Sequence, residues 1–218
     1  MKLFVFNGSP NARKTLAAAL HLDLDIKVEW MDVTSGELSK QAFLEINPNG
    51  KVPALQDGDF CVWESNAILV YLAVIGGSGL FPEQPQGRAN VLSWLFWETN
   101  QFNRAIGMFT WERVLKPAFG LGDADAEQLA RAEVMLSKAA PVLEKVLTVN
   151  EFVMGEKPTI ADFALGAFAA FIGPAQVPLG ASPAIRRWFE RLDEIPAWRA
   201  SAPDLTQLGR GGGLADVA

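Results

Sequence analysis

The first third of the chain alternates between two kinds of apolar spacing. Residues 2–6 (KLFVF) are apolar after the lysine, which predicts a buried strand. The segment GSPN interrupts this run, and Leu16, Ala19 and Leu20 then recur at helical spacing. Alternation returns over residues 25–32, where apolar residues lie between charged neighbours and predict a second strand. A strand, a helix and a strand in this order predict a βαβ unit with parallel strands.

A hairpin and a helix are predicted next. The strands PALQ (53–56) and FCVW (60–63) are joined by Asp57-Gly58-Asp59, a turn signal suited to a hairpin. A polar helix is predicted before them, over residues 39–46, and a more apolar helix after them, from Glu64 to about residue 74. The predicted order of elements in this region is therefore β-α-β-α-β-β-α.

Helical patterns dominate the remainder of the chain. A segment rich in glycine and proline (76–87) precedes them and marks a domain boundary. We expect a first domain over 1–76, a linker over 77–86, and an all-helical domain over 87–218 with a flexible glycine-rich tail. The fold class is thus an α/β domain followed by an all-α domain. Helices are predicted over 88–116, 125–147, 159–172, 183–193 and 196–201.

Composition excludes several classes of function. The chain has 218 residues, a net charge of -6 and a pI of about 4.9, and its basic residues are scattered, so nucleic acid is not an expected partner. Cys61 and His21 are the only residues of their types, so we expect no internal disulfide and no metal site. We expect Cys61 to be buried and inert. The N-terminal apolar run is too short for a secretory signal and residues 163–172 are too few to cross a bilayer, so we expect a cytoplasmic protein without a membrane partner.

Three motifs resemble those of the cytosolic glutathione S-transferases, and the resemblance spans nearly the whole chain. They are INPNGKVPAL (46–55), DGDFCVWESNAILVYLA (57–73) and KPTIADFALG (157–166). The resemblance implies a thioredoxin-like first domain, an all-helical second domain, and glutathione as co-substrate. It also implies a homodimer about a two-fold axis. In the third motif, Thr159 to Asp162 form a helix-capping box with a role in folding.

The resemblance places a glutathione site around Pro53. In the family the matching proline is cis, and the backbone of the residue before it, here Val52, pairs with the cysteinyl part of glutathione. A cis bond costs little only before proline, and an outward-facing Val52 backbone would offer a peptide ligand an open edge. Lys51 matches a position that often contacts the glycyl end, although a solvated turn would also suit it. Lys40 is the other basic residue close upstream of the third strand.

Glu64 and Ser65 open the helix that follows the hairpin. At a helix start, free N–H groups and the positive end of the dipole favour a carboxylate, which the Ser65 hydroxyl can also bind. The Glu64 carboxylate can meet an ammonium group. The γ-glutamyl end of glutathione carries both groups, so we expect both residues to bind it. Capping of the helix is the alternative role, and the two roles are compatible.

Ser9 is predicted to stabilise the glutathione thiolate. Members of the family use a tyrosine, serine or cysteine just after the first strand, and here the only tyrosine and the only cysteine lie elsewhere. Ser9 with Arg13 resembles the serine-type pattern, whereas Pro10-Asn11 is similar to the bacterial Nu class and makes Asn11 the second candidate. Ser9 is also an ordinary N-cap, and Arg13 an ordinary surface residue of a helix. Lowering a thiol pKa by about two units requires about 2.7 kcal/mol of differential stabilisation.

The aromatic segment 91–115 matches the family helix that forms one wall of the electrophile pocket. Aromatic and methionine side chains suit a broad apolar pocket, but at helical spacing most of them are expected in the core. The residues predicted to line the pocket are Trp97, Arg104, Met108 and Trp111.

The sequence thus predicts a glutathione transferase that conjugates glutathione to a small apolar electrophile or reduces a peroxide. Glutathione-dependent disulfide reduction is an alternative, which the similarity of Pro10-Asn11 to the Nu class keeps open. A non-catalytic ligand carrier or assembly module with the same fold is the second alternative.

Overall fold

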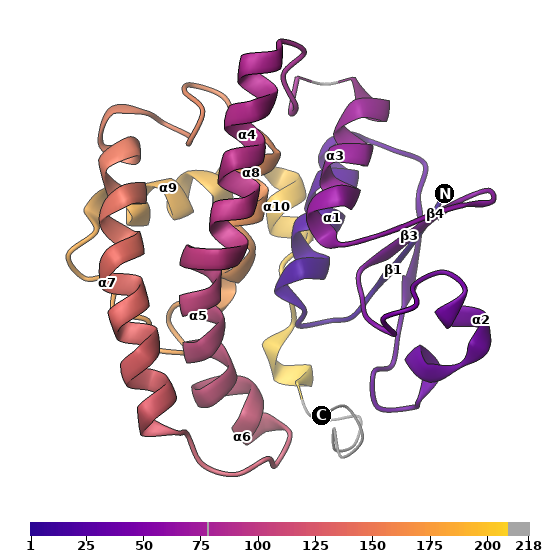
Figure 1. Ribbon diagram of the computed structural model, residues 1–218, viewed down its shortest axis with the longest axis horizontal. Helices are drawn as coiled ribbons and strands as arrows, with labels where there is room; N and C mark the ends of the chain where they lie inside the picture. Colours follow the sequence, from indigo (N-terminus) through magenta and orange to yellow (C-terminus); the bar gives the residue numbers. More distant parts are fainter. Residues whose placement is uncertain (78, 209–218) are drawn as a thin grey trace.

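The computed structural model describes residues 1–77 and 79–208, and a four-stranded sheet forms the N-terminal part of the described chain (Figure 1). The strand order is β2-β1-β3-β4. Strand β1 is parallel to β2 and antiparallel to β3, and β3 and β4 form the predicted hairpin. This is a thioredoxin-like sheet, and it confirms the predicted βαβ and ββα units. The strands are β1 (Lys2–Val5), β2 (Lys27–Trp30), β3 (Ala54–Asp57) and β4 (Phe60–Trp63).

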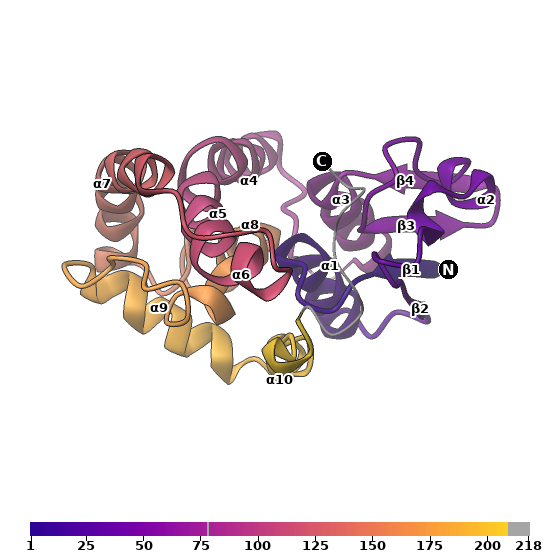
Figure 2. The same ribbon diagram turned by 90° about the horizontal axis from the view of Figure 1, so that it is seen from below.

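Helices cover both faces of the sheet. Helices α1 (Pro10–His21) and α3 (Ser65–Gly76) lie side by side between the sheet and the helical domain (Figures 1 and 2). Leu3 of β1 is fully buried in the core that these helices share. The neighbouring Phe4 contacts Phe43 of the short helix α2 (Gln41–Leu44), with ring centroids 5.7 Å apart. Alternate residues of β1 thus anchor opposite layers, as strand geometry requires.

Two details of this domain differ from expectation. The helix predicted over 39–46 is a 3-10 turn (Glu37–Ser39) followed by the single turn of α2, because Lys40 between them has an extended backbone. Cys61 is half-buried, so the prediction that it is buried was wrong. It lies on β4, which is an edge strand of the sheet and therefore lacks a neighbour on one side.

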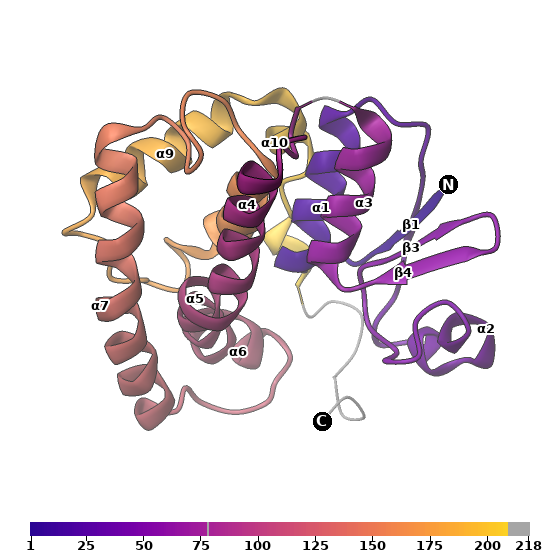
Figure 3. The same ribbon diagram turned by 45° about the horizontal axis from the view of Figure 1, so that its top comes forward.

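The C-terminal part of the described chain is helical, as predicted (Figure 3). The predicted helix over 88–116 is a continuous helical segment in which two π-helical turns interrupt the α-helix, and the helix predicted over 159–172 ends in a 3-10 segment. The elements of this helical C-terminal part are α4 (Pro85–Trp97), a π-turn (Glu98–Phe102), α5 (Asn103–Thr110), a π-turn (Trp111–Leu115), α6 (Lys116–Ala118), α7 (Ala126–Val149), α8 (Ile160–Leu165), a 3-10 segment (Gly166–Phe171), α9 (Pro183–Glu194), α10 (Pro196–Ala200) and a 3-10 turn (Leu205–Gln207).

Helix α8 is the centre of the helical domain, and all six of its residues are buried. It contacts α1, α3 and α4, so it joins the helical domain to the sheet domain. The predicted capping box starts it: Thr159 Oγ1 accepts from the N–H of Ala161, and Asp162 Oδ2 accepts from the N–H of Thr159 at 2.9 Å. A helix that is apolar all round needs such a cap, because water cannot satisfy its first N–H groups.

The chain returns to the sheet domain after α10. Asn7 Nδ2 donates to the carbonyl of Asp204 at 2.9 Å, and the N–H of Asp204 donates to Asn7 Oδ1 at 3.0 Å. Gly8 leaves no room for a Cβ against Leu208. This segment therefore covers the turn between β1 and α1. The predicted flexible tail lies, from residue 209 onward, outside the described residues.

Candidate active site

Six of the predicted site residues line one cavity of about 160 Å³. They come from three places in the fold: the first turn of α1, the loop before β3, and the start of α3. Two asparagines of the loop also line it, and sequence reasoning missed both of them. The lining residues are Asn11, Asn47, Asn49, Lys51, Val52, Pro53, Glu64 and Ser65.

The loop before β3 supplies one wall. The peptide bond between Val52 and Pro53 is cis, as the resemblance implied. The buried Asn47 organises the loop, because its Nδ2 donates to the carbonyl of Lys51 at 2.6 Å and its Oδ1 accepts from the N–H of Asn49 at 3.0 Å. The residues NPNG belong to the first of the three motifs, and their polar asparagines directly upstream of Lys51 were the signal that could have identified Asn47 and Asn49 as site residues.

The start of α3 supplies the second wall. Glu64 is its N-cap residue and has φ +70° and ψ 113°, a backbone conformation that side-chain-bearing residues rarely adopt. Such a conformation costs on the order of 1–3 kcal/mol and persists only where the surrounding structure imposes it. Ser65 is the first helical residue, and its Oγ donates to Asn11 Oδ1 at 3.4 Å. The side chains of Ser65 and Asn11 therefore meet across the cavity.

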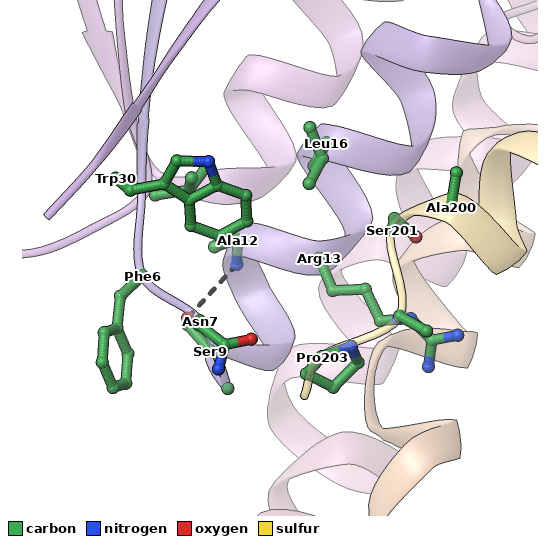
Figure 4. Close-up of a pocket in the computed structure, with 13 residues that line it drawn as sticks. Phe6, Asn7, Ser9, Ala12, Arg13, Leu16, Trp30, Ala200, Ser201 and Pro203 are labelled. Atoms are coloured by element: carbon green, nitrogen blue, oxygen red, sulfur yellow. Dashed lines mark hydrogen bonds between the residues drawn. The ribbon is translucent and has the colours of Figure 1, made fainter. Parts of the chain in front are cut away.

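Ser9 lies beside a different, smaller cavity of about 30 Å³ (Figure 4). It is the N-cap of α1, as predicted, and its Oγ accepts from the N–H of Ala12 at 3.2 Å. A hydroxyl that accepts one hydrogen bond still has its own proton to donate. The structure thus brings Asn11, but not Ser9, into the wall of the larger cavity.

Arg13 also lines the small cavity, and it is buried, with 5% of its surface exposed. Its guanidinium carbon lies 4.0 Å from the centroid of the Trp198 ring, a cation–π contact between α1 and α10. Nε and Nη1 of Arg13 have no hydrogen-bond partner among the described residues. Burial lowers the pKa of Arg13 to about 10, which the charge of Asp193 opposes. The alternative expectation that Arg13 is an ordinary surface residue of the helix was therefore wrong.

Lys40 lies at another groove, of about 380 Å³, between β2 and α2. Its lining residues include Trp30, Phe43 and Lys40, and none of the residues that line the cavity with Val52 and Ser65 lines this groove as well. Of the two candidate lysines for a glycyl carboxylate, only Lys51 lines the cavity with Val52 and Ser65.

The four residues predicted for the electrophile pocket lie along α4 and α5 and the turn after it. Trp97 stacks on Phe102 with ring centroids 6.0 Å apart, and Met108 packs partly against the core. Arg104 and Trp111 are exposed. None of the four lines the cavity that holds Ser65 or the one that holds Ser9. Their assignment to a second-substrate pocket stays a prediction.

Comparisons with known proteins agree with the fold and the motifs. The family model "Glutathione S-transferase, N-terminal domain" matches residues 1–74, and "Glutathione S-transferase, C-terminal domain" matches residues 102–196. The glutathione S-transferase APIC of Nicotiana tabacum is 30% identical over 200 residues, which is 88% of this chain and 93% of that protein.

Solved structures give the same result. A glutathione S-transferase from Pseudomonas fluorescens is 33% identical, with a TM-score of 0.78 over 90% of this chain and 96% of that one. The theta class glutathione S-transferase of Xanthomonas axonopodis pv. citri, solved with glutathione bound, is 27% identical, with a TM-score of 0.84 over 92% and 96% of the two chains. The fold, the cis-proline loop and these matches together define the class: the chain belongs to the glutathione S-transferase family, whose members are enzymes. Among the described residues, no helix is both long and apolar enough to cross a membrane.

Proposed function

We propose that this chain is a glutathione transferase that binds glutathione in the cavity between α1, the cis-proline loop and α3. The observation that carries the proposal is the convergence of Val52, Glu64 and Ser65 on one cavity. These residues offer an open backbone edge, a carboxylate and a hydroxyl at a helix N-terminus. Glutathione is an extended peptide with an ammonium and a carboxylate at its γ-glutamyl end, so each of its groups has a complementary partner.

The orientation of glutathione follows from the chemistry of the walls. The γ-glutamyl carboxylate binds at the N-terminus of α3 with Ser65, and its ammonium pairs with Glu64. The cysteinyl unit pairs with the backbone of Val52. The glycyl carboxylate then points to the loop before β3, where Lys51 supplies a positive charge and the second N–H of Asn49 Nδ2 supplies a donor.

The thiolate is stabilised at the first turn of α1. The two candidate donors to the sulfur are the Ser9 hydroxyl and the Asn11 side-chain amide, and the N-terminus of α1 supplies further positive potential. Asn11 is the favoured candidate for direct contact with the sulfur, because it lines the glutathione cavity and Ser9 does not. A thiol with its ordinary pKa near 8.5 is mostly protonated at neutral pH, so this stabilisation produces the nucleophile.

The second substrate is a small apolar electrophile or a peroxide. In conjugation, the thiolate sulfur forms a bond to an electrophilic carbon. In a substitution the bond to the leaving group breaks and that group departs with the electron pair; in an addition the π bond breaks and the atom that takes its electron pair is protonated. We place this substrate near Trp97, Arg104, Met108 and Trp111. Disulfide reduction is a second candidate, favoured by the position of Asn11 in the cavity wall.

A homodimer is also proposed. Large apolar side chains are exposed on β4, α3 and α4, which follow one another along the upper side of the molecule in Figure 2. Phe96 is 69% exposed and Phe60 50% exposed. Where exposed apolar side chains form one continuous patch, they mark a protein contact. Sedimentation analysis should give a dimer, and Phe96→Glu should shift it to monomer.

The experiment that tests the enzyme is the ultraviolet absorbance of the glutathione thiolate, titrated with pH on the wild-type protein, Ser9→Ala and Asn11→Ala. Calorimetry on the same proteins measures whether each binds glutathione. The proposal predicts a thiol pKa near 6.5 in the wild type, about two units below 8.5, and a higher value in at least one variant. Binding without any thiolate at pH 7 would leave a ligand carrier instead.

A further inference from the structure

A buried ion pair joins the sheet domain to the helical domain. Lys14 Nζ on α1 lies 2.9 Å from Glu98 Oε1, and only 2% of either side chain is exposed. Glu98 is the first residue of the π-turn that follows α4. Buried charges are rare and are retained in proteins only where they are paired and hydrogen-bonded.

Asn66 on α3 completes the contact with the sheet domain. Its Oδ1 accepts from Lys14 Nζ at 2.8 Å, and its Nδ2 donates to Glu98 Oε1 at 2.9 Å. Nδ2 also donates to the carbonyl of Leu95 at 2.9 Å, just before the π-turn. Asn66 therefore bonds both members of the ion pair.

The helical domain holds the other oxygen of Glu98. Asn103 Nδ2 donates to Glu98 Oε2 at 2.6 Å and to the carbonyl of Ala164 in α8 at 2.8 Å. The Thr99 hydroxyl lies 3.1 Å from Glu98 Oε1 and 3.1 Å from the carbonyl of Leu95, and its single proton can be donated to either acceptor. One carboxylate thus accepts hydrogen bonds from Lys14 on α1, Asn66 on α3 and Asn103 at the start of α5, and Thr99 within the π-turn is a further donor in reach.

The two sheet-domain partners lie directly behind the glutathione site. Lys14 is three residues after Asn11 on α1, and Asn66 follows Ser65 on α3. Asn11 and Ser65 meet across the cavity at 3.4 Å. The first turns of α1 and α3 are therefore joined on the cavity side by the weak Asn11–Ser65 contact, and behind the cavity by the buried Lys14–Glu98–Asn66 cluster.

We propose that Glu98 is a positioning residue that fixes the spacing of the first turns of α1 and α3, and hence the stabilisation of the glutathione thiolate. This inference rests on the proposed function. A π-turn inserts an extra residue into a helix and re-aims the side chains around it, and such turns are frequent at functional sites. From that turn the Glu98 carboxylate contacts Lys14 and Asn66 of the sheet domain, and it does not line the glutathione cavity.

Glu98→Gln tests the proposal. The amide would place a donor beside Lys14 or Asn103 and leave the buried ammonium without a counter-charge, so α1 and α3 should shift apart. We expect the thiol pKa of bound glutathione to rise by about one unit and the affinity for glutathione to fall about tenfold. The thiol pKa comes from thiolate absorbance and the affinity from calorimetry.

Glu112→Gln is the matched control. Glu112 is also buried, lies in the second π-turn, and pairs with Lys116 at 3.0 Å, but its partners belong to the helical domain alone. This variant should lose stability and leave both glutathione readouts unchanged. Equal thiol pKa values in the wild type and Glu98→Gln would overturn the proposal, and so would a rise in Glu112→Gln as large as in Glu98→Gln.

The double variant Lys14→Met/Glu98→Met covers the case in which Glu98→Gln does not fold. Replacing a buried ion pair by apolar residues of similar size often preserves stability. Its thiol pKa should nevertheless stay above that of the wild type, because the link to Asn66 is lost; a wild-type value would contradict the inference. The wild-type titration separates the two proposals: no thiolate there overturns the proposed function and this inference together, whereas a thiolate that Glu98→Gln leaves unchanged overturns the inference alone.

Discussion

The hydroxyl of Ser65 donates to the amide oxygen of Asn11 at 3.4 Å, across a cavity that neither residue would form alone. A bond of this length is weak, so a carboxylate can displace it at low cost. The Ser65 hydroxyl would then turn to the γ-glutamyl carboxylate and release Asn11 toward the sulfur. Binding of the γ-glutamyl carboxylate and stabilisation of the cysteinyl sulfur are thereby coupled through one side-chain contact.

Ser65→Ala should weaken glutathione binding about ten- to a hundredfold, the range expected for loss of one hydrogen bond to a charged group. Calorimetry with glutathione measures the effect. Ser137→Ala is the control, because Ser137 lies on α7 and its Oγ donates only to the carbonyl of Val134 in the described structure. Unchanged affinity in Ser65→Ala would place the carboxylate elsewhere.

Glu64→Gly should move stability and binding in opposite directions. The backbone of Glu64 has φ +70°, which glycine adopts without strain. Relief of this strain should exceed the entropic penalty of glycine and raise the free energy of unfolding by about 0.5–1 kcal/mol. The variant should also lose the partner of the γ-glutamyl ammonium.

Urea unfolding measures the first effect and calorimetry the second. Loss of both stability and binding would mean that the Glu64 side chain holds the fold together. Gain of stability with full binding would remove Glu64 from the glutathione site.

The parts of the site that could be predicted from the sequence are those with local signals. Pro53 at the head of β3, and Glu64 with Ser65 at the start of α3, are recognisable because a proline and a helix start restrict the backbone wherever they occur. Ser9 as the N-cap of α1 followed from the same logic. These local rules also predicted the hairpin between β3 and β4 correctly.

The parts that were missed depend on contacts between distant segments. Arg13 is buried because Trp198, far along the chain, stacks on it. The Lys14–Glu98 pair joins residues 84 positions apart, and nothing in either local sequence indicates it. The helix predicted over 39–46 is shorter in the structure because Lys40 has an extended backbone. Lys40 is neither a proline nor a glycine, so the local sequence carries no signal of this break. Periodicity describes one segment at a time, so it does not report which segments will meet.

Arg13→Met should change the free energy of unfolding by less than about 1 kcal/mol. The arginine gains a cation–π contact with Trp198, worth about 0.5–2 kcal/mol, but Nε and Nη1 are buried without a partner in the described chain, at a comparable cost. Methionine keeps much of the volume and a favourable contact with the ring. Urea unfolding checks this, with Arg13→Ala as the control that should be clearly destabilised by lost packing. A loss above 2 kcal/mol in Arg13→Met would show that the guanidinium has a strong partner in solution.

We expect Asp162 to make the stability of the protein depend on pH. It is fully buried and accepts from the N–H groups of Val153 and Thr159, the Thr159 hydroxyl and the Trp188 indole. Burial raises its pKa from 3.8 to about 6, and the hydrogen bonds oppose the rise. Because the folded-state pKa exceeds the unfolded one, the stabilising effect of proton binding is complete below pH 3.8 and is lost as the pH rises through about 6.

The shift corresponds to about 3 kcal/mol, at 1.36 kcal/mol for each pKa unit. Asp162→Asn cannot titrate, so the wild-type advantage over this variant in the free energy of unfolding should shrink by most of that amount, about 2 kcal/mol, between pH 4 and pH 7. Urea unfolding of both proteins across this range measures the difference, and the comparison cancels the titration of every other group that the substitution leaves unchanged. A constant difference would mean that the pKa of Asp162 is the same in the folded and unfolded states, because the four donors then offset its burial in full.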